Sequence, residues 1–167
     1  LGFHGTVLPV GLMHTAARLM KRLGDPARQA WKWSEKPGEI PASRIDLLSH
    51  DPDRYADELW WRDARPELVM GPGSWGWVER AYASMRSTYR PGALEGVTTP
   101  VLLLAAENDK LVAMNAIEQA AARLPHGELV RFGLEARHEI LREADPVRDR
   151  AMAAIDDFLN RTASPAG

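Results

Sequence analysis

The stretch PVLLLAAENDKLV at residues 100–112 decides the fold class of the chain. Residues 101–106 form an unbroken apolar run that follows a proline and precedes the polar turn 107–110. A run of this kind is typical of a β-strand that is covered on both faces, as in a parallel sheet. We therefore expect a buried strand over Val101–Ala106, with a loop directly after it.

The residues after this strand indicate one more unit of helix, strand and helix. Apolar residues in 111–124 recur at helical spacing and stop at Pro125, and the alternating segment 128–132 predicts a second strand. Asp145 and Pro146 predict the start of the last helix, because an acidic residue before a proline is typical of a helix start. The order of these elements indicates an α/β fold. Since two parallel strands alone leave apolar faces uncovered, we expect the rest of the sheet to lie upstream, outside this chain. The inner faces of the two helices are predicted to carry Ile117, Ala120, Ala121 and Leu124, and then Val147, Ala151, Ile155, Phe158 and Leu159.

The residues before position 95 predict a helical layer and no convincing strand. One helix should end at Gly24, a second should begin at Asp51, and a third should be capped by Ser74. All six Trp residues lie in this half, and two uses fit them: an apolar entrance or membrane contact, and aromatic packing between helices. The apolar faces predicted for the three helices are Leu12, Ala16, Leu19, Met20 and Leu23, then Tyr55, Leu59 and Trp60, then Val78, Ala81, Tyr82 and Met85.

The composition excludes several classes of protein. The chain has 167 residues, of which 45% are hydrophobic and 26% charged, so it is neither disordered nor fibrous and fits one ordinary domain. Its net charge of −2 gives no basis for binding nucleic acid. A membrane-spanning helix needs about 18 consecutive apolar residues, and no apolar run in the chain approaches that length. The absence of cysteine excludes thiolate catalysis, and the scattered histidines predict no metal site. Because the chain begins with Leu1 rather than Met, we expect it to be the back part of a longer protein.

Two polar residues follow the predicted strands and are candidates for catalysis. Asp109 lies in the loop after the first strand, and His138 lies 29 residues later in the loop after the second. Ligands of open α/β sheets bind at the carboxyl ends of the strands, where these two residues should meet. An aspartate that accepts the Nδ1–H of a histidine fixes the tautomer of the ring and stabilises its charged form. Taken alone, Asp109 is more typical of a turn residue, and His138 of a structural or solvated histidine.

The segments around both residues resemble a known family. Residues 100–112 resemble the strand and loop that carry the triad acid of α/β-hydrolases, and ARHEIL at 136–141, with Glu143, resembles the loop that carries the triad histidine. The resemblance is closest to the lysophospholipase and monoacylglycerol lipase branch, and it implies that Asp109 and His138 are triad members. Looser matches to the cap of that branch extend the resemblance over residues 1–160; they are SHDPDRY at 49–55 and GPGSWGW at 71–77.

The serine nucleophile of this family has no counterpart in the chain. No Gly-x-Ser-x-Gly motif occurs, and in the nearest segment, PGSWG at 72–76, Ser74 lacks a preceding strand and is explained by helix capping. We therefore expect the nucleophile and the oxyanion hole to lie outside this chain, and the chain alone to be inactive. Three alternatives remain open: a relative with an aspartate nucleophile that cleaves epoxides or carbon–halogen bonds, a non-catalytic interaction module, and an inert fragment.

The resemblance implies a partial α/β-hydrolase fold. A helical cap would occupy residues 1–95, the last two strands and helices of a mostly parallel sheet would occupy 96–162, and a flexible tail would occupy 163–167. The implied activity is hydrolysis of lipid esters, such as lysophospholipids and monoacylglycerols, by a Ser-His-Asp mechanism. The resemblance implies no cofactor and no metal, and a metalloprotease motif does not follow His138 because position 142 is Arg. We expect a cytoplasmic protein that contacts membranes peripherally and needs the N-terminal half of the fold.

Overall fold

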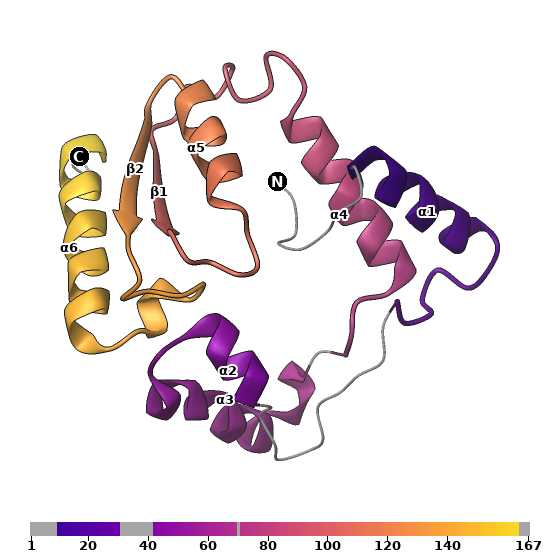
Figure 1. The fold of residues 1–167 in the computed structure, drawn as a ribbon, viewed down its shortest axis with the longest axis horizontal. Coiled ribbons are helices and arrows are strands. Elements are labelled where there is room, and N and C mark those ends of the chain that lie inside the picture. Colours follow the sequence, from indigo (N-terminus) through magenta and orange to yellow (C-terminus); the bar gives the residue numbers. More distant parts are fainter. Residues whose placement is uncertain (1–9, 31–41, 70, 164–167) are drawn as a thin grey trace.

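The computed structural model describes residues 10–30, 42–69 and 71–163. Figure 1 shows a strand pair with a helix on either side, a pair of long helices at one edge of the molecule, and a second helical pair near the strand ends. Expectations for Trp31, Trp33 and residues 164–167 of the predicted tail lie outside the described residues. In the part of the chain that the structure describes, no helix is long and apolar enough to cross a bilayer.

The predicted strands are present and parallel. Strand β1 (Val101–Ala106) pairs with β2 (Gly127–Phe132) in a register that joins Val101 to Gly127 and Ala106 to Phe132. Helix α5 (Met114–Arg123) connects the two strands, and α6 (Asp145–Thr162) lies on the other side of the pair (Figure 1). Because both strands run in the same direction, their carboxyl ends reach one edge of the sheet, as the sequence predicted.

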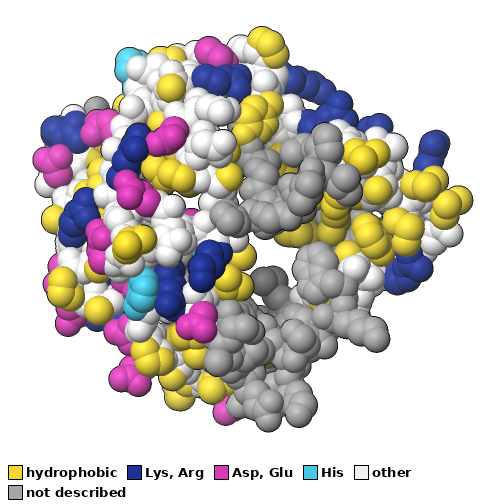
Figure 2. All heavy atoms as spheres, in the orientation of Figure 1, with side chains coloured by type: hydrophobic (Ala, Val, Ile, Leu, Met, Phe, Trp, Pro, Cys, Tyr) yellow, Lys and Arg dark blue, Asp and Glu magenta, His cyan; other side chains and the backbone are white. Residues whose placement is uncertain are grey.

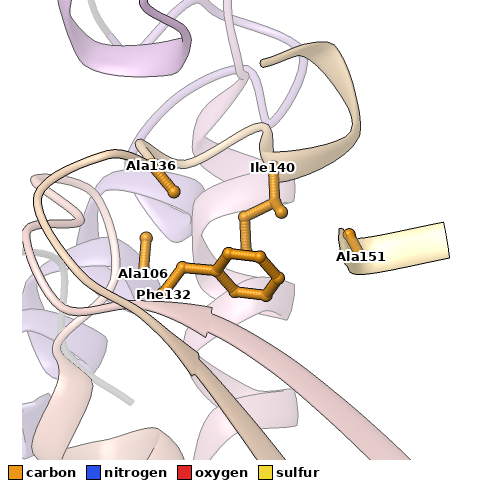
Figure 3. Packing of buried hydrophobic residues seen from close by; sticks show 5 residues of the cluster. All are labelled: Ala106, Phe132, Ala136, Ile140 and Ala151. Atoms are coloured by element: carbon orange, nitrogen blue, oxygen red, sulfur yellow. The ribbon is translucent and has the colours of Figure 1, made fainter. Parts of the chain in front are cut away.

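The hydrophobic core lies at the carboxyl ends of the strands. Each strand contributes its last residue, Ala106 or Phe132, and neither side chain is more than 2% exposed. Figure 3 shows these residues below the loop that follows β2, with α6 beside them. The remaining members of this core cluster are Ala136, Ile140 and Ala151. The core therefore fixes the loop in which the candidate histidine lies.

Helices α1 (Val10–Arg22) and α4 (Trp75–Thr88) pack against each other, but the face predicted for α1 is wrong. Residues His14 and Ala17 of α1 are buried, whereas Leu12, Leu19 and Leu23 are 53%, 54% and 76% exposed. Small and polar residues of α1 make the contact because Ala17 allows a close approach and His14 bonds to α4. The sequence showed that one stripe of α1 is apolar, but spacing alone does not show what covers such a stripe.

Helices α2 (Ala42–Leu48) and α3 (Pro52–Ala64) lie next to the loop after β2 (Figure 1). The predicted start of α3 is confirmed, since the side chain of Asp51 accepts a hydrogen bond from the Arg54 amide at 3.0 Å. Tyr55 is fully buried as predicted, but Trp60 is 61% exposed and does not belong to the inner face. Trp60 instead packs edge-on against the neighbouring Trp61, which is also exposed. Two short 3-10 helices complete the described fold: η1 (Pro66–Leu68) and η2 (Ile140–Arg142).

Candidate active site

Asp109 lies in the turn directly after β1, and its two carboxylate oxygens have different partners. Oδ1 accepts hydrogen bonds from the backbone amides of Leu111 at 2.7 Å and Val112 at 3.0 Å. These bonds are those of a turn-forming aspartate. Oδ2 remains free of the turn and faces His138. The turn explanation and the catalytic explanation of Asp109 are thus compatible, because each uses a different oxygen.

His138 lies in the loop after β2 and meets Asp109 across the strand ends. The distance from His138 Nδ1 to Asp109 Oδ2 is 2.7 Å, so the ring donates its Nδ1 proton to the carboxylate. This bond favours the tautomer in which Nε2 of the neutral ring carries no proton and can accept one. The Asp109 side chain is 7% exposed and that of His138 is 35% exposed. The carboxylate is therefore shielded, while the ring remains accessible.

The accessible ring of His138 lines a surface depression at the end of the sheet. Leu104 of β1 contributes one wall, and the chain after His138 contributes the rest. The lining combines three apolar side chains with the imidazole, one acidic and one basic side chain; it consists of Leu104, His138, Glu139, Ile140, Leu141 and Arg142. With Nε2 accessible, His138 can take a proton from a polar group that lies in this partly apolar depression.

A buried carboxylate, Glu143, holds the histidine loop against the turn between α2 and α3. Its side chain is 1% exposed and accepts hydrogen bonds from the Arg137 amide at 2.8 Å and the His50 amide at 2.9 Å. Nearby, the buried Ser49 donates its hydroxyl proton to the Arg142 carbonyl at 2.7 Å. The sequence signal for this contact was the segment at 49–55 together with Glu143, but it gave no reason to pair the two.

The helix-capping role predicted for Ser74 is confirmed. Its side-chain oxygen accepts a hydrogen bond from the Trp77 amide at 3.1 Å, so it caps the start of α4. The remaining histidines of the described segments are not arranged as metal ligands, and no cluster of three or more His, Cys, Asp or Glu side chains there could hold a metal ion.

A second buried carboxylate, Glu79, was not singled out from the sequence. It lies on α4 and faces α1, where Lys21 Nζ donates to it at 3.0 Å and His14 Nε2 lies 3.3 Å away. The hydrogen bonds from Lys21 and His14 hold the pKa of Glu79 below its usual value. Glu79 therefore joins the two helices as a charged group rather than as a proton donor.

Comparison with known proteins relates the chain to lysophospholipases. A scan against protein-family models found no match. The chain is 33% identical to lysophospholipase L2 of Escherichia coli K12 over 129 residues, which are 74% of this chain and 37% of that protein. It is 28% identical to a probable lysophospholipase L2 of Haemophilus influenzae over 95 residues, covering 57% of this chain and 29% of that protein. The chain thus spans little more than a third of the first relative.

Solved structures show the same fold. A soluble variant of monoglyceride lipase from Saccharomyces cerevisiae, in complex with a substrate analogue, superimposes on 99% of this chain with a TM-score of 0.65 and 14% identity. The monoacylglycerol lipase of Paleococcus ferrophilus superimposes on 96% with a TM-score of 0.65 and 20% identity. The chain covers 52% and 55% of those two proteins. The chain is therefore related to lysophospholipase L2, and it shares part of the α/β-hydrolase fold of the two monoglyceride lipases.

Proposed function

We propose that the protein to which this chain belongs is a carboxylic ester hydrolase that acts on lipid esters of the lysophospholipid and monoacylglycerol class. The observation that carries the proposal is the 2.7 Å contact between His138 Nδ1 and the shielded carboxylate of Asp109. The relationship to lysophospholipase L2 supports the choice of substrate class.

In the proposed reaction, His138 moves protons and Asp109 orients it. As a serine hydroxyl attacks the ester carbonyl, its proton passes to Nε2 of His138, and the carboxylate of Asp109 stabilises the charged ring. The tetrahedral intermediate collapses, and the proton on Nε2 passes to the departing alkoxide, which leaves as an alcohol. Water then loses a proton to Nε2 as it attacks the acyl-enzyme, and the serine regains that proton when the fatty acid is released.

The serine belongs, in this proposal, to a segment outside the chain. The half-sheet supports this part of the proposal: β1 pairs with β2 on one side, and within the described segments no strand pairs with its other edge. Residues Val101–Leu104 of β1 are only partly buried although they are all apolar. A neighbouring strand with a nucleophile turn at its carboxyl end would cover this edge and present its serine to the same end of the sheet as His138.

The proposal is tested by reading the coding sequence upstream of Leu1 and assaying the complete protein. A Gly-x-Ser-x-Gly motif after a buried strand, together with hydrolysis of a monoacylglycerol or a lysophospholipid, supports ester hydrolysis. An aspartate in place of the serine would instead assign the protein to epoxide or haloalkane cleavage. A start codon at residue 1 with no ester hydrolysis would favour an interaction module.

We further propose that the protein works at a membrane surface, where its lipid substrate is found. Leu12 and Leu19 are exposed on α1, Leu23 is exposed directly after its end, and the exposed Arg18 and Arg22 lie on the same helix. An apolar stripe flanked by basic residues is typical of a helix that lies in the interface of an anionic bilayer. Figure 2 shows hydrophobic and basic side chains gathered at the edge of the molecule that α1 occupies.

A further inference from the structure

The loop that carries His138 is attached to the α2–α3 turn on both sides of that residue. Before it, the Arg137 amide donates to Glu143, and the Arg137 guanidinium donates to the Ser49 carbonyl at 2.8 Å. After it, the Glu139 amide donates to the Leu48 carbonyl at 2.8 Å. His138 itself uses its ring to contact Asp109. The backbone on either side of the histidine is therefore fixed by a segment almost ninety residues earlier in the chain.

Glu143 is the charged group at the centre of this attachment. Oε1 accepts from the Arg137 amide at 2.8 Å and lies 3.0 Å from His50 Nδ1, while Oε2 accepts from the His50 amide at 2.9 Å. Hydrogen bonds to an ionised acceptor are stronger than those between neutral groups. A buried carboxylate that lost these donors would be left unpaired, which is costly. Glu143 is therefore held firmly, and so is the amide next to His138.

We propose that Glu143 is a positioning residue for His138. By holding the Arg137 amide, it sets the backbone from which the imidazole projects, and with it the direction in which Nε2 faces the reacting hydroxyl. It does not itself touch the reacting atoms. The inference rests on the proposed function, because it requires His138 to act as the catalytic base.

The neighbouring Ser49 provides a contrast within the same contact. It is also fully buried, and its hydroxyl bonds to the Arg142 carbonyl at 2.7 Å and accepts from the Asp51 amide at 3.0 Å. Neither bond reaches a residue adjacent to His138. Loss of this hydroxyl should therefore weaken the contact between the two segments without turning the imidazole.

The test uses the complete protein and p-nitrophenyl butyrate as substrate. Glu143→Gln preserves size, but its amide oxygen can face the Arg137 amide or the His50 amide and not both, so one N–H group meets an NH2 group. Glu143→Ala removes both acceptors. Because small misplacements of a catalytic group reduce turnover strongly, we expect kcat to fall about tenfold for Gln and about a hundredfold for Ala, with KM within about twofold of wild type. The downfield proton resonance of His138 Nδ1–H should shift or broaden in both variants.

Two control variants separate positioning from mere stability. Ser49→Ala should lower the midpoint of thermal unfolding while kcat and the Nδ1–H resonance stay at wild-type values. His50→Ala removes the imidazole beside Glu143 but keeps both backbone amides, and its kcat should also be unchanged. If Ser49→Ala lowers kcat as much as Glu143→Gln does, the effect of Glu143 is structural and the inference is wrong.

The failure of this inference differs from the failure of the proposed function. Wild-type kcat and an unchanged resonance in Glu143→Gln, with His138→Ala inactive, would overturn the positioning role alone. Full turnover in His138→Ala would overturn the proposed function and the positioning role with it. If Glu143→Ala does not fold, Glu143→Gln decides the question, because it keeps the volume and part of the hydrogen bonding.

Discussion

At the scale of single residues, Asp109 depends on being a carboxylate rather than an amide. One oxygen holds the turn through Leu111 and Val112, and the other receives the proton of His138 Nδ1. An asparagine could keep the turn with its oxygen, but its NH2 group would then face Nδ1. The ring would have to accept there and carry its proton on Nε2, which could no longer take a proton from a nucleophile.

We therefore expect Asp109→Asn and His138→Ala to lower ester turnover of the complete protein by about three to four orders of magnitude. The reason is the same in both variants, since each removes an Nε2 that can accept a proton. The measurement is kcat/KM for a monoacylglycerol, with circular dichroism to show that both variants are folded. Near-normal turnover in either folded variant would contradict the roles assigned to the pair.

The sequence predicted this pair well because the interaction follows from topology. Once two parallel strands are recognised, the residues that follow them are expected at one edge, which made Asp109 and His138 candidates. The resemblance of the segments around them to α/β-hydrolases then singled them out as a pair, since each residue taken alone has a more ordinary explanation. For Glu143, the sequence offered only its place after the segment that resembles the histidine loop of α/β-hydrolases. Its partners His50 and Arg137 lie 93 and 6 residues away, and no periodicity or spacing links a carboxylate to a backbone amide in a distant turn.

At the scale of secondary-structure elements, the pair Glu95–Arg123 ties the segment before β1 to the end of α5. Arg123 donates Nε to Glu95 Oε1 at 2.7 Å and Nη2 to Oε2 at 3.0 Å, and Nη2 also reaches the Arg90 carbonyl. These hydrogen bonds from Arg123 lower the pKa of Glu95 to about 2. In the unfolded chain the pKa of the Glu95 carboxyl is higher, about 4.3.

The pair should therefore stabilise the fold above the unfolded pKa and lose that effect as the pH falls towards the folded value. We expect Glu95→Gln to be less stable than wild type at neutral pH, and the difference to shrink between about pH 5 and about pH 2. Urea unfolding across this range measures the difference, and Arg123→Gln should show the same trend. A constant difference between wild type and Glu95→Gln at every pH would rule the pair out as its cause.

Helix α1 shows what periodicity does not decide. Two faces of α1 could pack against a neighbouring helix. The face with His14 and Ala17 packs against α4, where Glu79 bonds to His14. The apolar stripe formed by Leu12, Leu19 and Leu23 is exposed in the described structure. The strands and their boundaries were easier to predict, because a short apolar run bounded by proline and polar turn residues has few other interpretations.

The exposed stripe gives a direct test of the membrane proposal. Leu19→Glu replaces an exposed apolar side chain with a charge, and burial of one leucine in a bilayer interface contributes enough to change binding about tenfold. We expect that loss in co-sedimentation of the complete protein with vesicles of phosphatidylglycerol and phosphatidylcholine. Met152→Glu is the matched control, since Met152 is 42% exposed on α6, which lies at the opposite edge of the molecule from α1 (Figure 1). Equal vesicle binding by Leu19→Glu and wild type would refute the role of α1.

At the scale of the whole molecule, the described structure pairs a histidine with a carboxylate at the end of a sheet of only two strands. The core at the strand ends fixes the histidine loop, and the α2–α3 turn holds it from the other side. These contacts lie within the chain, so the Asp109–His138 geometry does not depend on further strands. The position of a serine nucleophile would depend on further strands, because such a serine lies in a strand-to-helix turn at the same edge of the sheet.

The isolated chain of 167 residues should therefore not react with a fluorophosphonate probe, which labels serines activated by a neighbouring base. Ser74 is the serine of the chain that most resembles a nucleophile motif, but its oxygen accepts a hydrogen bond from the Trp77 amide as a helix cap, a role that needs no reactivity. The complete protein should be labelled on a serine upstream of Leu1, and His138→Ala should abolish that labelling. Mass spectrometry of the labelled peptide locates the modified residue, and a probe adduct on Ser74 in the isolated chain would show that the nucleophile lies within these residues after all.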